Sequence, residues 1–168
     1  SEMVPYGPAT LAKVDAWISQ IDARGGAEIL APMMEAARLA PDGVIVLMTD
    51  GEVANESEIV DSFMAARGTA SVYSFGIGSN VSDALLRELA DRTDGAVQLI
   101  HPGERIDEKV TAQFARATAA RVDNVTLKWI GADAGEVAPL DPPALVDGEP
   151  WSVYGRYEQP GFGRVEIR

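Results

Sequence analysis

A continuous apolar run in the first third of the chain places the strongest limit on its fold. The run Gly43-Val44-Ile45-Val46-Leu47-Met48-Thr49-Asp50 is rich in β-branched residues and does not alternate with polar ones. Such runs are typical of strands that are buried on both faces, as in a parallel sheet covered by helices. The sequence therefore predicts a buried parallel strand within residues 43–50.

Helical and strand patterns alternate after this run. The predicted order is a helix over 57–67, a strand over 71–78, a helix capped by Ser82, a strand over 96–100 and a helix from about Glu104. This alternation indicates an α/β fold, a doubly wound Rossmann-like parallel sheet flanked by helices. Right-handed crossovers then fix the order of neighbouring strands.

The helices carry more specific expectations. Thr10 is expected to be the N-cap of a first helix, and a second helix is expected from near Glu28. In the last helix, the helical spacing predicts one inward stripe made of Ile106, Val110 and Phe114.

The character of the chain changes after about Arg121. Residues 131–150 are rich in Gly and Pro and are expected to form a loop or linker. The alternating stretch 151–157 and the stretch 164–167 are expected to pair as a hairpin around a turn at Gln159-Pro160-Gly161. We therefore predict an α/β domain over residues 8–120 and a small antiparallel β appendage over residues 121–168.

Charge and composition exclude several classes of function. The 168 residues carry 26 acidic and 14 basic side chains, a net charge of −12. Phosphate binding needs clustered Lys and Arg, so nucleic acid and anionic membrane surfaces are poor partners. The chain has no cysteine, which excludes disulfides, thiol nucleophiles and Cys-based zinc sites but leaves the compartment open. No apolar run is long enough to span a membrane.

Asp50 is the first candidate for chemistry. It follows the predicted buried strand and precedes Gly51, and ligands of open α/β sheets bind beyond the carboxyl ends of the strands. A carboxylate in that place suits a hard cation such as Mg²⁺. A plain turn, in which Asp50 bonds to nearby backbone, accounts for the same residues.

Two other chemistries are compatible with parts of the pattern. Asp50 could accept a phosphoryl group, but this chemistry uses a Lys at a neighbouring strand end, and the next strand ends in Gly76-Ile77-Gly78-Ser79. The two glycines of that ending resemble a dinucleotide fingerprint whose third Gly position holds Val81. His101 has no Ser or Cys motif to serve, and we expect a surface loop residue there.

Aromatic residues gather in the predicted β appendage. Trp129, Trp151, Tyr154 and Tyr157 lie within a stretch of predicted strands and loops. They are compatible with core packing of the appendage and with a partner-binding surface, because exposed aromatic side chains favour interfaces. Trp151 and Tyr154 are therefore candidate partner-binding residues.

Three sequence motifs together resemble a known family. Gly25-Gly26-Ala27-Glu28-Ile29-Leu30, the run from Val44 to Asp50-Gly51-Glu52, and Phe75-Gly76-Ile77-Gly78 follow in this order. The order and spacing resemble the von Willebrand factor type A (VWA) domain, and the resemblance covers nearly the whole chain from about Pro8. It implies a doubly wound sheet with a metal-ion-dependent adhesion site at the carboxyl ends of the strands.

The second half of the chain carries a finer resemblance. Pro102-Gly103-Glu104-Arg105-Ile106-Asp107-Glu108-Lys109-Val110, Phe114-Ala115-Arg116, Gly148-Glu149-Pro150 and Tyr154-Gly155-Arg156-Tyr157 look like the VIT-plus-VWA proteins related to inter-alpha-trypsin inhibitor heavy chains.

The family's metal site usually combines an Asp-x-Ser-x-Ser loop, a Thr and an Asp. The resemblance places the Asp at Asp50 and the Thr at Ala27, which has no oxygen in its side chain. The Asp-x-Ser-x-Ser loop is absent from the sequence, and we expect the first strands of the family sheet to be missing. With one carboxylate left, helped by Glu52 or by waters, we expect no tight Mg²⁺ site in this chain. A complete parent domain would bind Mg²⁺ less well because of Ala27.

These expectations lead to one functional hypothesis and one about assembly. The resemblance implies a non-enzymatic protein-recognition or adhesion module with a degenerate metal site. Glu52 is a further candidate partner-binding residue. The alternative is a structural module that positions neighbouring domains. If the first strands are missing, the strand near 44–49 has an exposed edge, which predicts homodimerisation or strand exchange.

Overall fold

The computed structural model describes residues 2–22, 26, 28–122, 124–131, 134–139, 144–158 and 161–168. The chain divides into two compact units, residues 1–113 and 114–168, which are described separately. The division between the units falls within helix α5 (Ile106–Thr118). The domain boundary expected near residue 120 stays a prediction.

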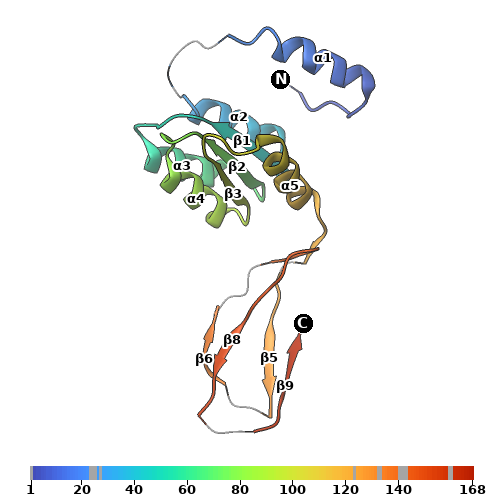
Figure 1. The fold of residues 1–168 in the computed structure, drawn as a ribbon, viewed down its shortest axis with the longest axis vertical. Coiled ribbons are helices and arrows are strands. Elements are labelled where there is room, and N and C mark those ends of the chain that lie inside the picture. Colours follow the sequence, from blue (N-terminus) through green and yellow to red (C-terminus); the bar gives the residue numbers. More distant parts are fainter. Residues whose placement is uncertain are drawn as a thin grey trace. The chain divides into compact units, whose positions relative to one another are not determined.

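Three parallel strands form the centre of the first unit. They are β1 (Val44–Thr49), β2 (Ser71–Ile77) and β3 (Ala96–Ile100), hydrogen-bonded in the order β1-β2-β3. Helices α3 (Glu56–Ala66) and α4 (Asp83–Arg92) connect them (Figure 1). The α/β fold predicted from the alternating pattern is therefore confirmed.

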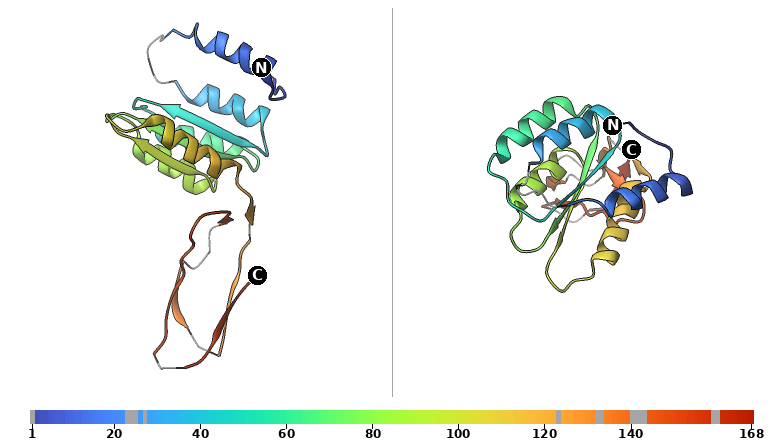
Figure 2. Two further views of the ribbon diagram at one scale, coloured as in Figure 1. Left: turned by 45° about the vertical axis from the view of Figure 1, so that its right-hand side comes forward. Right: turned by 90° about the horizontal axis from the view of Figure 1, so that it is seen from above.

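One face of the sheet carries the main core. Helix α2 (Leu30–Leu39) lies with α3 and α4 on this face (Figure 2). Phe63 and Leu89 are fully buried there. The whole cluster consists of the apolar residues Met33, Ala37, Ile45, Ile59, Val60, Phe63, Ala70, Val72, Leu85 and Leu89. Burying each large side chain contributes about 1.5–3 kcal/mol, so this face supplies much of the unit's stability.

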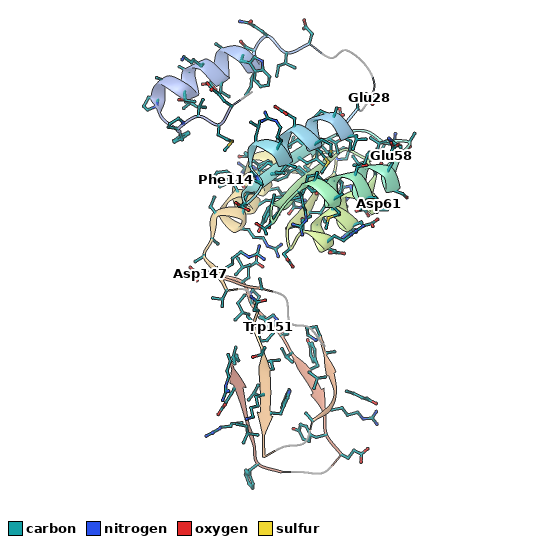
Figure 3. The ribbon with its side chains drawn as sticks, turned by 180° about the vertical axis from the view of Figure 1, so that it is seen from behind. Glu28, Glu58, Asp61, Phe114, Asp147 and Trp151 are labelled. Carbon is teal, nitrogen blue, oxygen red and sulfur yellow. The ribbon has the colours of Figure 1, made fainter. Side chains whose placement is uncertain are left out.

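Helix α5 covers the opposite face through a polar residue. Gln113 is 6% exposed, and its amide Nε2 donates hydrogen bonds of 3.1 Å to the carbonyl oxygens of Ser74 in β2 and Ala96 in β3. The predicted inward stripe is wrong at two positions, because Ile106 is half-exposed and Phe114, labelled in Figure 3, is 61% exposed. Each residue turns a helix by about 100°, so the bonds of Gln113 turn Phe114 out of the interface.

Strand β1 is only half covered. Ile45 is buried, but Val44, Val46 and Met48 on the other face are 44–53% exposed. The expectation of burial on both faces is wrong for β1, whereas β2 is buried on both faces. The hydrogen bonds of Gln113 hold α5 over β2 and β3, which leaves this face of β1 open.

The first helix begins before its predicted cap. Helix α1 (Pro8–Ile18) has Gly7 at its N-cap and Pro8 in its first turn, where the missing N–H is tolerated. Thr10 lies inside the helix, and its Oγ1 donates to the carbonyl oxygen of Pro5 at 2.9 Å. The prediction of Thr10 as the N-cap is therefore wrong. None of the residues of α1 is buried.

The described residues of the second unit form three antiparallel strand pairs. β4 (Arg121–Val122) pairs with β7 (Leu145–Val146), β5 (Leu127–Ile130) with β9 (Arg164–Ile167), and β6 (Gly135–Ala138) with β8 (Tyr154–Arg156). The antiparallel character is as predicted.

The pairing partners in the second unit differ from the sequence prediction. We expected residues 151–157 and 164–167 to form one hairpin, whereas β8 pairs with β6 and β9 with β5. The predicted turn residues Gln159 and Pro160 lie outside the described residues. The expected loop over 131–150 contributes β6 and β7, because alternation in sequence identifies a strand but not its partner.

Candidate functional site

The carboxyl ends of the three parallel strands meet at one edge of the sheet. β1 ends at Thr49, β2 at Ile77 and β3 at Ile100, and the loops that follow leave from this edge. Ligands of open α/β sheets bind in this position. The loop after β1 carries the predicted site residues Asp50 and Glu52, so the carboxyl edge is the candidate functional site.

The loop after β1 presents two exposed carboxylates from an anchored backbone. Asp50 and Glu52 are both exposed. The backbone N–H of Val53 donates to Ser82 Oγ at 3.1 Å, which ties this loop to the start of α4. Ser82 was predicted to cap α4, and it does stand at the N-cap position, but it makes no side-chain capping bond. Its hydroxyl holds the Asp50 loop in place instead.

Backbone geometry and close packing explain two glycines at the end of β2, Gly76 in the strand and Gly78 in the loop that follows. Gly78 has φ +103°, a conformation that favours glycine, and its N–H donates to the carbonyl oxygen of Ile100 at 2.8 Å. A Cβ at Gly76 would lie 2.8 Å from Leu99 and 3.0 Å from Leu86. Turn geometry and close packing of α4 on β2 therefore account for the two glycines that resemble a dinucleotide fingerprint.

An ion pair that the sequence pattern did not identify joins the loop after β3 to helix α5. Glu104 Oε2 accepts hydrogen bonds of 2.6 Å from Lys109 Nζ and from the backbone N–H of His101. Lys109 Nζ also donates to the carbonyl oxygen of Leu99 at 3.0 Å. The bond from Lys109, followed by that from His101, lowers the pKa of Glu104. The five-residue spacing of the pair is not a helical spacing, so periodicity gave no signal for it.

The described residues at the edge bring few potential metal ligands together. Mg²⁺ prefers six oxygen ligands in octahedral geometry. Within the part of the chain that the structure describes, no group of three or more His, Cys, Asp or Glu side chains is placed to hold a metal ion. Ala27, at the position of the family's Thr, lies outside the described residues. The expectation of a weak or vestigial site at Asp50 stays a prediction.

The second unit carries exposed aromatic side chains. Tyr154 is 71% exposed, and Phe162, which the sequence analysis did not single out, is almost fully exposed. Trp151, labelled in Figure 3, is half-buried. The indole N–H groups of Trp129 and Trp151 are buried and have no hydrogen-bond partner among the described residues. Trp129 packs on Gly155, where a Cβ would lie 3.0 Å from the ring. Trp129 therefore serves packing. The expectation that Trp151 and Tyr154 bind a partner stays a prediction.

No described helix is long and apolar enough to cross a membrane.

Comparisons with known proteins agree with the fold. The family model of the von Willebrand factor type A domain matches residues 1–99. The chain is 31% identical to human von Willebrand factor A domain-containing protein 5B1 over 78% of its length, and 25% identical to rat protein 5A over 95%. These alignments span 11% and 20% of the relatives.

A solved structure of a von Willebrand factor type A protein from Catenulispora acidiphila superposes with a TM-score of 0.59. It has 18% sequence identity, and the superposition covers 99% of this chain and 43% of that one. It supports the fold alone. Because the family model matches more than half of the residues, the chain belongs to the von Willebrand factor type A domain family, whose domains are protein-interaction modules.

Proposed function

We propose that the chain is a non-enzymatic recognition module that binds a protein partner at the carboxyl edge, using its own carboxylates instead of a bridging metal ion. The observation that carries this proposal is the pair Asp50 and Glu52, exposed on a loop that the Val53–Ser82 bond anchors. A fixed loop loses little conformational freedom when a partner binds. The net charge of −12 favours a partner with basic side chains at the contact.

The charges around the edge weigh against phosphoryl transfer to Asp50. That chemistry requires a free cation to stabilise the phosphoryl group. Lys109, which follows β3, is engaged by Glu104 and by the carbonyl oxygen of Leu99. The proposal of a non-enzymatic role rests on this arrangement and on the family. The role of positioning neighbouring domains remains the alternative.

The first experiment measures thermal unfolding with and without millimolar Mg²⁺ or Mn²⁺. A cation at 100 times its dissociation constant would stabilise the protein by about 2.7 kcal/mol, a shift of roughly 5–10 °C for a chain of this size. We expect no shift that depends on Asp50, so wild type and Asp50→Ala should respond alike. The matched control is Asp147→Ala, an exposed Asp in the second unit.

A shift that Asp50→Ala abolishes and Asp147→Ala retains would overturn the metal-independent proposal. Metal-bridged adhesion would then be the better account of the carboxyl edge.

The edge of β1 supports a second candidate function, self-association. Within the described residues, β1 is hydrogen-bonded to β2 alone, so its other edge offers unpaired backbone groups. We propose that a second copy of the chain adds to this edge, by dimerisation or strand exchange. Light scattering across a concentration series tests the homodimer, and a monodisperse monomer throughout would contradict it.

A further inference from the structure

Helix α1 carries an apolar stripe that nothing in the described structure buries. Leu11, Val14 and Ile18 are 40–55% exposed, and Trp17 is 65% exposed. At about 100° per residue, these four side chains lie within roughly 120° of the helix circumference. A stripe of that width is typical of a helix that packs on a core.

The open face of β1 is an apolar surface of matching size. Val44, Val46 and Met48 point to the same side of the strand, and each is about half exposed. Their neighbours on the same face of β2, Tyr73 and Phe75, are buried. The sheet therefore has one covered half and one uncovered half on the α5 side. From Val44 to Met48 the strand rises about 13 Å, and α1 rises about 11 Å from Leu11 to Ile18.

The chain between the two surfaces is long enough to bring them together. Helix α2 packs on the opposite face of the sheet, with Met33 and Ala37 in the core beside Ile45. Helices on opposite faces of a sheet are separated by about 20 Å, roughly 10 Å on each side. Residues 19–29 join α1 to α2 and, when extended, reach about 36 Å. The segment can therefore pass around the β1 edge.

We propose that α1 packs its apolar stripe against the open face of β1 in its own chain and completes the cover of the sheet. When the stripe of α1 and the open face of β1 pack together, their apolar side chains, which are otherwise about half exposed, are removed from water. The same-chain helix is favoured over a helix of a second copy, because the short tether keeps its effective concentration high. This inference is independent of the proposed role of Asp50 and Glu52.

Hydrogen exchange of the α1 amides tests the proposal. An isolated helix of this length is marginal in water, so undocked α1 should exchange almost as fast as an unfolded peptide. We expect the α1 amides of the wild type to exchange at least about tenfold more slowly than that. Val46→Asp places a charge on the open face and should abolish most of this protection. The matched control, Val165→Asp in the second unit, changes a residue of the same type and similar exposure.

Protection of the β2 amides in each variant shows that the sheet remains folded. Fast exchange of α1 in the wild type would overturn the proposal. So would protection of α1 that Val46→Asp leaves intact, because α1 would then be held elsewhere.

Cross-linking distinguishes the same chain from a second copy. The chain has no cysteine, so Val14→Cys with Val46→Cys gives one defined pair for a short bismaleimide. We expect a cross-linked monomer by intact mass. In the control pair, Ala12→Cys with Val46→Cys, the first cysteine lies on the opposite side of α1, about 200° from Val14. This pair should cross-link several-fold less than the Val14–Val46 pair. A cross-linked dimer as the main product would overturn the same-chain proposal in favour of exchange between copies.

Discussion

Replacing Gln113 with Met tests whether a buried amide holds α5 on the sheet. Both N–H groups of the Gln113 amide are used, since Nε2 donates to the carbonyl oxygens of Ser74 and Ala96. Each such bond contributes about 0.5–1.5 kcal/mol net, so the loss of both predicts about 1–3 kcal/mol. Met has a similar length and fills the same space, so little stability should be lost through a cavity.

Urea unfolding followed by circular dichroism measures this loss. We expect the free energy of unfolding of Gln113→Met to fall by about 1–3 kcal/mol, and the melting temperature by roughly 2–4 °C per kcal/mol. Gln20→Met, at an exposed position after α1, is the control and should change stability by less than about 0.5 kcal/mol. Unchanged or increased stability of Gln113→Met would refute the view that these hydrogen bonds anchor the helix.

Two further predictions concern a close backbone approach and an ion pair. A Cβ at Gly95 would overlap the carbonyl oxygen of Val72, so Gly95→Ala should lower stability by about 1–3 kcal/mol or more. Gly161→Ala, whose new Cβ meets no described atom within 4 Å, should leave stability unchanged. Equal unfolding midpoints for the two variants would contradict this prediction. The bond from Lys109 lowers the pKa of Glu104 below its ordinary 4.5. The stabilisation that follows from this lowered pKa is present above pH 4.5 and is lost as the pH falls through the pKa of Glu104 in the folded state. The free energy of unfolding of Glu104→Gln should therefore fall less steeply with decreasing pH in that range than that of the wild type. The same pH dependence of unfolding in wild type and Glu104→Gln would contradict this prediction.

The strands and connecting helices of the first unit were predictable because their signals are local. The strand over residues 96–100 was predicted with the bounds it has, and the strand near 71–78 differs by one residue. The run at 44–49 indicated a strand correctly. Its half-open face depends on where α5 lies, and that is fixed by contacts distant in sequence.

The details that the sequence did not predict depend on contacts between distant residues. The inward face of α5 is fixed by the polar bonds of Gln113, whereas hydrophobic periodicity favoured Phe114. Ser82 has the sequence pattern of a cap, yet its hydroxyl bonds to Val53, 29 residues away. The alternation of apolar and polar residues likewise did not predict which strands pair in the second unit. The resemblance to inter-alpha-trypsin inhibitor heavy chain-like proteins stays a prediction.

The bonds between the loops at the carboxyl edge bear on how binding specificity can change. Val53 is tied to Ser82, and Gly78 is tied to Ile100, so the three loops are linked in series. A substitution that moves one loop therefore also changes the position of the loop bonded to it. Surface side chains such as Asp50 and Glu52 can be exchanged singly, whereas insertions or deletions in one loop would require compensation in its neighbour. We expect natural variants of this edge to differ in side chains at constant loop length.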